Sequence, residues 1–286
     1  MNYPVASIAE YGYKERKVLK VLWKIFQKLL VVLTVVGLYM PIIVIAIQSL
    51  NTSTDASTFS GFTFYWYLNM FENQSLTESI KNTFIISISA TLASTILGTL
   101  IAIGIHYLPS KVKQRVMLIN NIPLLNADIV TGISLMLLFS LFLPIFPHIF
   151  GFPTLFLAHV FFTLPYIILS VLPKFKEIDP NLMDAAMDLG KKPFAAAVSV
   201  LVPAVKSGIF SGAILAFTIS FEDFVVSYFT TGNGFDTLSI WLYSSKGKNS
   251  LTPSVYAFNT ILIVVSILLI VVYQLVKGKM RNGKKN

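Results

Sequence analysis

The amino-acid sequence predicts an all-α membrane protein with six transmembrane helices. Of its 286 residues, 55% are hydrophobic and only 12% are charged, whereas a soluble domain carries about 25% charged residues. The apolar residues gather in runs long enough for a helix to cross a bilayer, which takes about 20 residues. Basic residues are confined to some of the segments between these runs, as in a membrane protein of fixed topology.

The predicted spans cover residues 28–48, 82–107, 116–143, 152–173, 206–230 and 254–276. Pro41 lies within the first span, where a proline bends a helix. The first span is long and no A-x-A-like cleavage site follows it, so we expect an uncleaved helix rather than a signal peptide.

The distribution of lysine and arginine predicts the orientation. All but three of the 22 basic residues precede the first span, follow the last, or lie between spans two and three or four and five; the exceptions are Lys81, Lys246 and Lys248. The positive-inside rule therefore predicts a multi-pass protein of the cytoplasmic (inner) membrane with both termini cytoplasmic. We expect a cytoplasmic segment 1–27, a first helix 28–48, a transmembrane domain 78–276 with a cytoplasmic loop 174–205, and a basic tail 277–286.

Several function classes are excluded by composition. The chain has no cysteine, which excludes disulfides and thiolate metal sites. Its three histidines, His106, His148 and His159, lack ligand spacing, so no metal site is expected. No Walker A pattern or nucleophile–base pair appears, so we expect neither a cofactor in this chain nor an enzyme. Because the positive charge lies in loops, no nucleic-acid partner is expected.

Small residues recur at every fourth position of two predicted helices. The second carries Ala90, Ser94, Gly98 and Ala102, and the fifth carries Gly208, Gly212, Ala216 and Ser220. Small side chains let membrane helices approach closely, so these two helices are predicted to pack into a compact core.

Three carboxylates lie inside predicted spans, namely Asp128, Glu222 and Asp223. A charge at the bilayer centre costs about 2.5–3.5 kcal/mol, so such groups face protein or water. At 100° per residue, Asp223 falls in the middle of the arc covered by Gly208 to Ser220 and Glu222 falls at its edge, so both are expected to point toward other helices or a central path. No lysine or arginine lies at comparable depth, so the acids are expected to be unpaired within this chain. They either line a path for a cation or are protonated or hydrogen-bonded structural groups, and both interpretations stay open here.

The cytoplasmic loop 174–205 is predicted to form two short helices. Asp179 before Pro180 is typical of a helix start, and the first helix should run to Leu189. Gly190 supplies a left-handed stop, and a second helix begins near Pro193.

The same loop carries a spaced motif. Asp184-Ala185-Ala186 is followed by Gly190 and later by Val200, Val202 and Pro203. This pattern resembles the EAA loop of binding-protein-dependent ABC importer permeases, with Asp184 for the usual Glu and Val202 for the usual Leu. The resemblance covers about residues 78–276 and implies the type I ABC importer permease fold.

The resemblance also implies partners. In that family the loop residues Asp184, Ala185, Ala186, Gly190 and Pro203 would couple the spans to an ATPase dimer, which holds ATP and Mg²⁺. A second homologous permease and an extracellular solute-binding protein would complete a machine that works by alternating access.

Two further segments resemble the spermidine/putrescine permeases of the PotC type: 212–229, which contains Glu222-Asp223, and 123–135, which contains Asp128. This resemblance implies a polyamine substrate. The alternatives are the same machine with another small solute, an ion-driven secondary transporter or channel, and a membrane scaffold.

Overall fold

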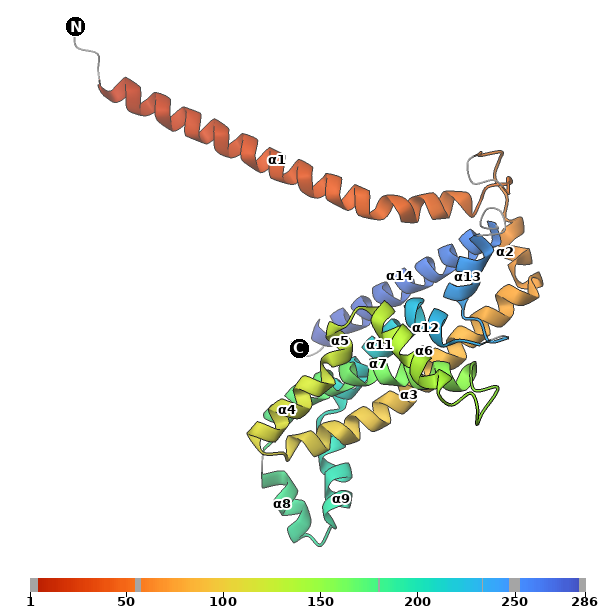
Figure 1. The fold of residues 1–286 in the computed structure, drawn as a ribbon. Coiled ribbons are helices and arrows are strands. Elements are labelled where there is room, and N and C mark those ends of the chain that lie inside the picture. Colours follow the sequence, from red (N-terminus) through yellow and green to blue (C-terminus); the bar gives the residue numbers. More distant parts are fainter. Residues whose placement is uncertain (1–4, 55–57, 180, 233, 247–252, 283–286) are drawn as a thin grey trace. The chain divides into compact units, whose positions relative to one another are not determined.

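In a computed structural model, the described residues are 5–54, 58–179, 181–232, 234–246 and 253–282 (Figure 1). Within them the chain is helical, apart from loops and an isolated bridge between Asn51 and Phe62. The chain divides into two compact units, one of Met1–Met70 with Ser250–Asn286 and one of Phe71–Asn249.

The first unit contains the two terminal helices. Helix α1 (Val5–Gln48) continues through Pro41, and α14 (Pro253–Asn282) contacts α1 and the short helix α2 (Tyr65–Asn69). Asn51 organises the loop after α1, because its side chain bonds the Ser60 amide at 3.0 Å and its carbonyl accepts from the Trp66 indole at 2.8 Å. A 3-10 turn, η1 (Met70–Glu72), follows α2.

The core of the second unit is made by three helices, α3 (Gln74–His106), α7 (Phe152–Val171) and α11 (Lys206–Glu222), which pack against one another. Both predicted stripes of small residues are buried on this core. A Cβ atom added at Gly98 would lie 2.8 Å from Ile167, and one at Gly208 would lie 2.7 Å from the Ser170 carbonyl oxygen. The predicted close packing of the second and fifth spans is therefore confirmed, with α7 as the neighbour of both.

The third predicted span is not one helix. It consists of α4 (Ser110–Asn120), α5 (Ile122–Leu125) and α6 (Asp128–Ser140). Asn126 and Ala127 adopt extended backbone, with ψ of 146° and 138°. Pro123 lacks an amide hydrogen and cannot donate to a carbonyl of α4, which is one physical reason for the break between α4 and α5.

The fifth predicted span is also interrupted. Helix α11 ends at Glu222, Asp223 is extended with ψ of 130°, and α12 (Val225–Thr230) follows, before α13 (Leu238–Lys246). Among the described residues, three helices are long and apolar enough to span a bilayer: Lys20–Gln48, Gln74–His106 and Phe152–Glu177. A fourth results if Pro193–Ala204 and Lys206–Glu222, bent by 74°, count as one span. Six continuous spans are therefore not confirmed, because two of the predicted spans are broken helices.

The loop between α7 and α11 contains several short elements. They are the 3-10 turn η2 (Leu172–Glu177), α8 (Asn181–Asp188), α9 (Pro193–Ala196), the π turn η3 (Ala197–Leu201) and α10 (Val202–Ala204). Phe175, Leu201 and Val205 join Ile167 in a buried apolar cluster that anchors this loop to the helical core.

Candidate functional site

The break between α11 and α12 is held by an aspartate. The Asp223 carboxylate accepts hydrogen bonds from the Val226 amide at 3.3 Å and the Ser227 amide at 2.7 Å. These amides belong to the first turn of α12, where no carbonyl of the helix can accept from them, so the side chain acts as a helix cap. The expectation that Asp223 lies in the middle of the arc of small residues is therefore wrong, because α11 has already ended at Glu222.

A second helix break lies beside the first. Asp128 is the first residue of α6, directly after the extended residues 126 and 127. One turn later, a Cβ atom at Gly132 would lie 2.8 Å from the Phe229 ring and 3.4 Å from the Val225 carbonyl oxygen. This close contact between α6 and α12 brings the starts of the two helices together.

The three predicted acids line one pocket of about 330 Å³. Its walls are Pro123, Leu124, Asp128, Thr131, Phe162, Tyr166, Ile219, Glu222, Asp223, Phe224, Val225 and Val226. Asp128 and Glu222 are exposed, whereas the Asp223 side chain is 10% exposed. Residues 94 positions apart in the sequence thus contribute to one acidic cavity, whose aromatic rings can also attract a cation.

Of the two interpretations kept open for the acids, that of a hydrogen-bonded group applies to Asp223. Besides the two amides, its carboxylate accepts a hydrogen bond from the Ser227 hydroxyl at 2.7 Å, and the His159 Nε2 atom lies 3.8 Å away. Within the described part of the chain, the Asp128 and Glu222 carboxylates have no hydrogen bond or ion pair. The partners of Asp223 are backbone amides and a serine, which the helix break supplies.

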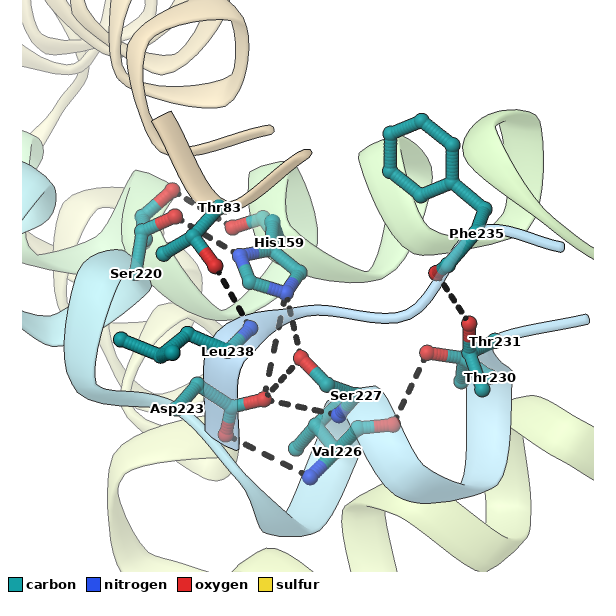
Figure 2. Close-up of polar contacts among 11 residues, drawn as sticks. Thr83, His159, Ser220, Asp223, Val226, Ser227, Thr230, Thr231, Phe235 and Leu238 are labelled. Carbon is teal, nitrogen blue, oxygen red and sulfur yellow. Dashed lines mark hydrogen bonds and ion pairs between the residues drawn. The ribbon is translucent and has the colours of Figure 1, made fainter. Parts of the chain in front are cut away.

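His159 is the residue that the sequence interpretation missed. It lies on α7, is fully buried, and contacts Ser220 with Nδ1 at 2.7 Å and Ser227 with Nε2 at 2.9 Å. Figure 2 shows its ring between the two serines, close to Asp223. The sequence does mark this residue, because an ionisable side chain inside an apolar span is a functional candidate in its own right.

The loop 174–205 has the shape that its sequence predicts. The Asp179 carboxylate accepts from the Asn181 amide at 2.9 Å, which caps the start of α8; Pro180 itself lies outside the described residues. At the other end, the Lys191 amide donates to the Ala186 carbonyl at 3.2 Å and the Gly190 amide to Met187 at 2.8 Å. With φ of +85° at Gly190, this is a complete Schellman motif, and the predicted glycine stop is confirmed.

The motif residues of this loop divide between surface and interior. Asp184, Ala185, Gly190 and Pro203 are exposed, whereas Ala186 is 6% exposed. Ala185 thus faces outward, whereas Ala186 turns toward the rest of the loop. Leu189 and Phe194 are 83% and 72% exposed at the tip between the two short helices, so this face presents apolar side chains.

Comparison with known proteins identifies the family. The model of the family described as "Binding-protein-dependent transport system inner membrane component" matches residues 94–282. The chain belongs to this family of ABC importer permeases. The family description itself names the inner membrane and the dependence on a binding protein.

Named relatives of this permease are polyamine permeases. It is 34% identical over 242 residues to the spermidine/putrescine permease PotC of Haemophilus influenzae, covering 85% of this chain and 92% of the relative. It is 32% identical to PotC of Escherichia coli strain K12, covering 86% and 91%, and 29% identical to the putrescine permease PotI of that strain, covering 79% and 81%. The suspected relationship to PotC is therefore confirmed.

Solved structures confirm the fold class of this permease. A bacterial ABC transporter involved in the import of the acidic polysaccharide alginate matches with a TM-score of 0.65 at 16% identity, covering 91% of this chain and 96% of the other. The same kind of transporter in complex with an alginate pentasaccharide-bound periplasmic protein matches with a TM-score of 0.64 at 17% identity, covering 90% and 94%. At such low identity the likeness concerns the fold, which is that of a type I ABC importer permease.

Proposed function

We propose that this permease imports a polyamine of the spermidine/putrescine class across the cytoplasmic membrane by alternating access, driven by a partner ATPase. The observation that carries the proposal is the acidic pocket at the two adjacent helix breaks. The names of the relatives PotC and PotI point to the same class of substrate.

The chemistry of the pocket suits an aliphatic polycation. Primary amines resemble the lysine side chain, whose pKa is about 10.4, so a polyamine carries several charges at neutral pH. Asp128 and Glu222 offer carboxylates without a partner among the described residues, and Asp223 adds a third at the pocket wall. Phe162, Tyr166 and Phe224 supply ring faces for cation–π contacts with the same ligand.

The cytoplasmic loop suits a coupling role. In this proposal, a dimer of ATPase subunits holding ATP and Mg²⁺ docks on the exposed Asp184, Ala185 and Gly190, while the buried Ala186 fixes α8 to the loop. Pro203 in α10 lies next to the 74° bend that leads into α11. Movement of the loop would therefore reach the pocket through α11.

Further partners follow from the family. A second homologous permease completes the path beside the exposed Asp128 and Glu222, and an extracellular solute-binding protein delivers the cargo. The distribution of basic residues supports cytoplasmic locations for both termini.

Uptake of labelled spermidine and putrescine into proteoliposomes that contain the complete transporter tests the proposal. We expect ATP-dependent uptake, reduced at least about tenfold by Asp128→Asn or Glu222→Gln, because a close pair of opposite charges is lost in each. Glu78→Gln is the matched control, since this carboxylate bonds only the neighbouring Gln74 side chain among described residues and does not line the pocket.

Three results would count against the proposal. Uptake of another solute in place of polyamines would contradict the proposed substrate but not the ATP-driven import. Uptake without ATP would favour an ion-driven transporter. Normal uptake and normal assembly in both pocket variants would remove the acids from the path.

A further inference from the structure

A buried chain of hydrogen bonds connects α7 to both sides of the break between α11 and α12. Ser220 lies in the last turn of α11, Ser227 lies in α12, and His159 lies between them on α7. Their exposed fractions are 2%, 0% and 0%. One ring nitrogen thus faces each helix, and Figure 2 shows the chain continuing from Ser227 to Asp223.

The direction of these hydrogen bonds follows from the number of protons. The Ser227 hydroxyl has one hydrogen, which it donates to Asp223 Oδ2 at 2.7 Å. The hydroxyl must therefore accept from His159, whose Nε2 atom carries the hydrogen. In the neutral imidazole, Nδ1 is then an acceptor, and Ser220 donates to it at 2.7 Å. Every donor in the chain points toward the next acceptor, and the last acceptor is the Asp223 carboxylate.

His159 acts from outside the pocket. It is absent from the pocket wall, whereas Asp223 is part of that wall. A serine hydroxyl can otherwise bond the backbone carbonyl three or four residues earlier, which for Ser227 is that of Phe224 or Asp223. Without the donor at Nε2, the Ser227 hydroxyl is free to turn to this alternative, and Asp223 loses one of its two shortest hydrogen bonds.

We infer that His159 is a positioning residue for cation passage: acting through the Ser227 hydroxyl, it fixes the Asp223 carboxylate against the first turn of α12 at the pocket wall. The part of this inference that concerns passage rests on the proposed function. The part that concerns the position of the carboxylate does not.

A matched pair of substitutions tests the inference. In His159→Gln the side-chain amide reaches about the position of Nε2 and still donates to Ser227, whereas in His159→Asn it reaches only the position of Nδ1. The complete transporter in nanodiscs is analysed by hydrogen exchange of the segment 224–231, which contains the amides capped by Asp223. The same variants are assayed for spermidine uptake per ATP hydrolysed.

We expect the asparagine variant to speed exchange of this segment about tenfold and to lower uptake per ATP about tenfold, as for loss of a hydrogen bond to a charged group. The glutamine variant should stay within about twofold of the unchanged protein in both measurements. In an Asp223→Asn background, His159→Asn should add no further effect, because the residue through which it acts has been changed.

Equal effects of the two substitutions, or effects that add to those of Asp223→Asn, would show that His159 serves packing alone and would overturn the inference. If the asparagine variant does not assemble, Ser227→Ala removes the same link and must reproduce the faster exchange; unchanged exchange there also overturns it. If the unchanged transporter moves no polyamine but the exchange pattern appears, the proposed function fails and the positioning role stands.

Discussion

The packing of α11 on α7 makes a quantitative prediction for Gly208→Ala. The added Cβ atom would lie 2.7 Å from the Ser170 carbonyl oxygen and 3.2 Å from the Val171 Cα atom. Both are backbone atoms, which cannot turn aside as a flexible side chain does. An ordinary contact needs at least 3.4 Å, so α11 must withdraw by roughly 0.7 Å or distort, and overpacking of this kind costs about 1–3 kcal/mol.

Gly104→Ala on α3 is the matched control. Nothing lies within 4 Å of the Cβ atom added there, so this variant gains the helix propensity of alanine, about 1 kcal/mol, without a clash. Gly208→Ala gains the same propensity, and the difference between the two variants isolates the cost of the contact.

Thermal unfolding of the purified complex measures this difference. For a chain of this size, 1 kcal/mol changes the melting temperature by about 2–4 °C, so Gly208→Ala should melt roughly 2–12 °C below Gly104→Ala. A Gly208→Ala protein as stable as the control would refute the view that backbone contact fixes α11 on α7.

Three further variants probe the loop and the pocket. Gly190→Val places a β-branched residue at φ of +85°, a backbone conformation that such a residue disfavours. We expect normal membrane insertion but ATP hydrolysis that is uncoupled from uptake. Normal uptake would contradict the coupling role. Asp179→Ala removes the cap of α8 and should destabilise that helix by about 1 kcal/mol, seen as faster hydrogen exchange over 181–188; unchanged exchange would mean that the cap contributes nothing. Gly132→Val brings a side chain against the Phe229 ring and should separate α6 from α12. Uptake should then fall several-fold while assembly stays intact. Unchanged uptake would show that the starts of the two helices need not be adjacent.

The sequence predicts best those features that depend on neighbouring residues. Asp179 and Gly190 mark the ends of α8, because a cap and a left-handed glycine act within one turn. The small residues of α3 and α11 are predicted equally well, since their spacing of four places them on one face of a helix.

The breaks in two spans are harder to predict. A span is predicted from the mean hydropathy of a stretch of residues, which depends on composition alone. This mean does not show that residues 126–127 and 223–224 depart from helical hydrogen bonding. The partners of His159 lie 61 and 68 residues away, so only the packing of α7 against α11 and α12 brings them together. Asp223 illustrates both points, because its role as a cap depends on the break and its environment depends on α7.

The position of α11 has a mechanical consequence. Its first residue, Lys206, follows the 74° bend at the end of the loop 174–205, and its last residue, Glu222, lies at the pocket. With 17 residues and a rise of 1.5 Å per residue, it is a rod about 25 Å long. A rotation of about 10° at its base would carry Glu222 through about 4 Å, more than the length of a hydrogen bond. In the proposed import cycle, a small tilt imposed at the loop 174–205 would thus be enough to make or break a contact between Glu222 and the cargo.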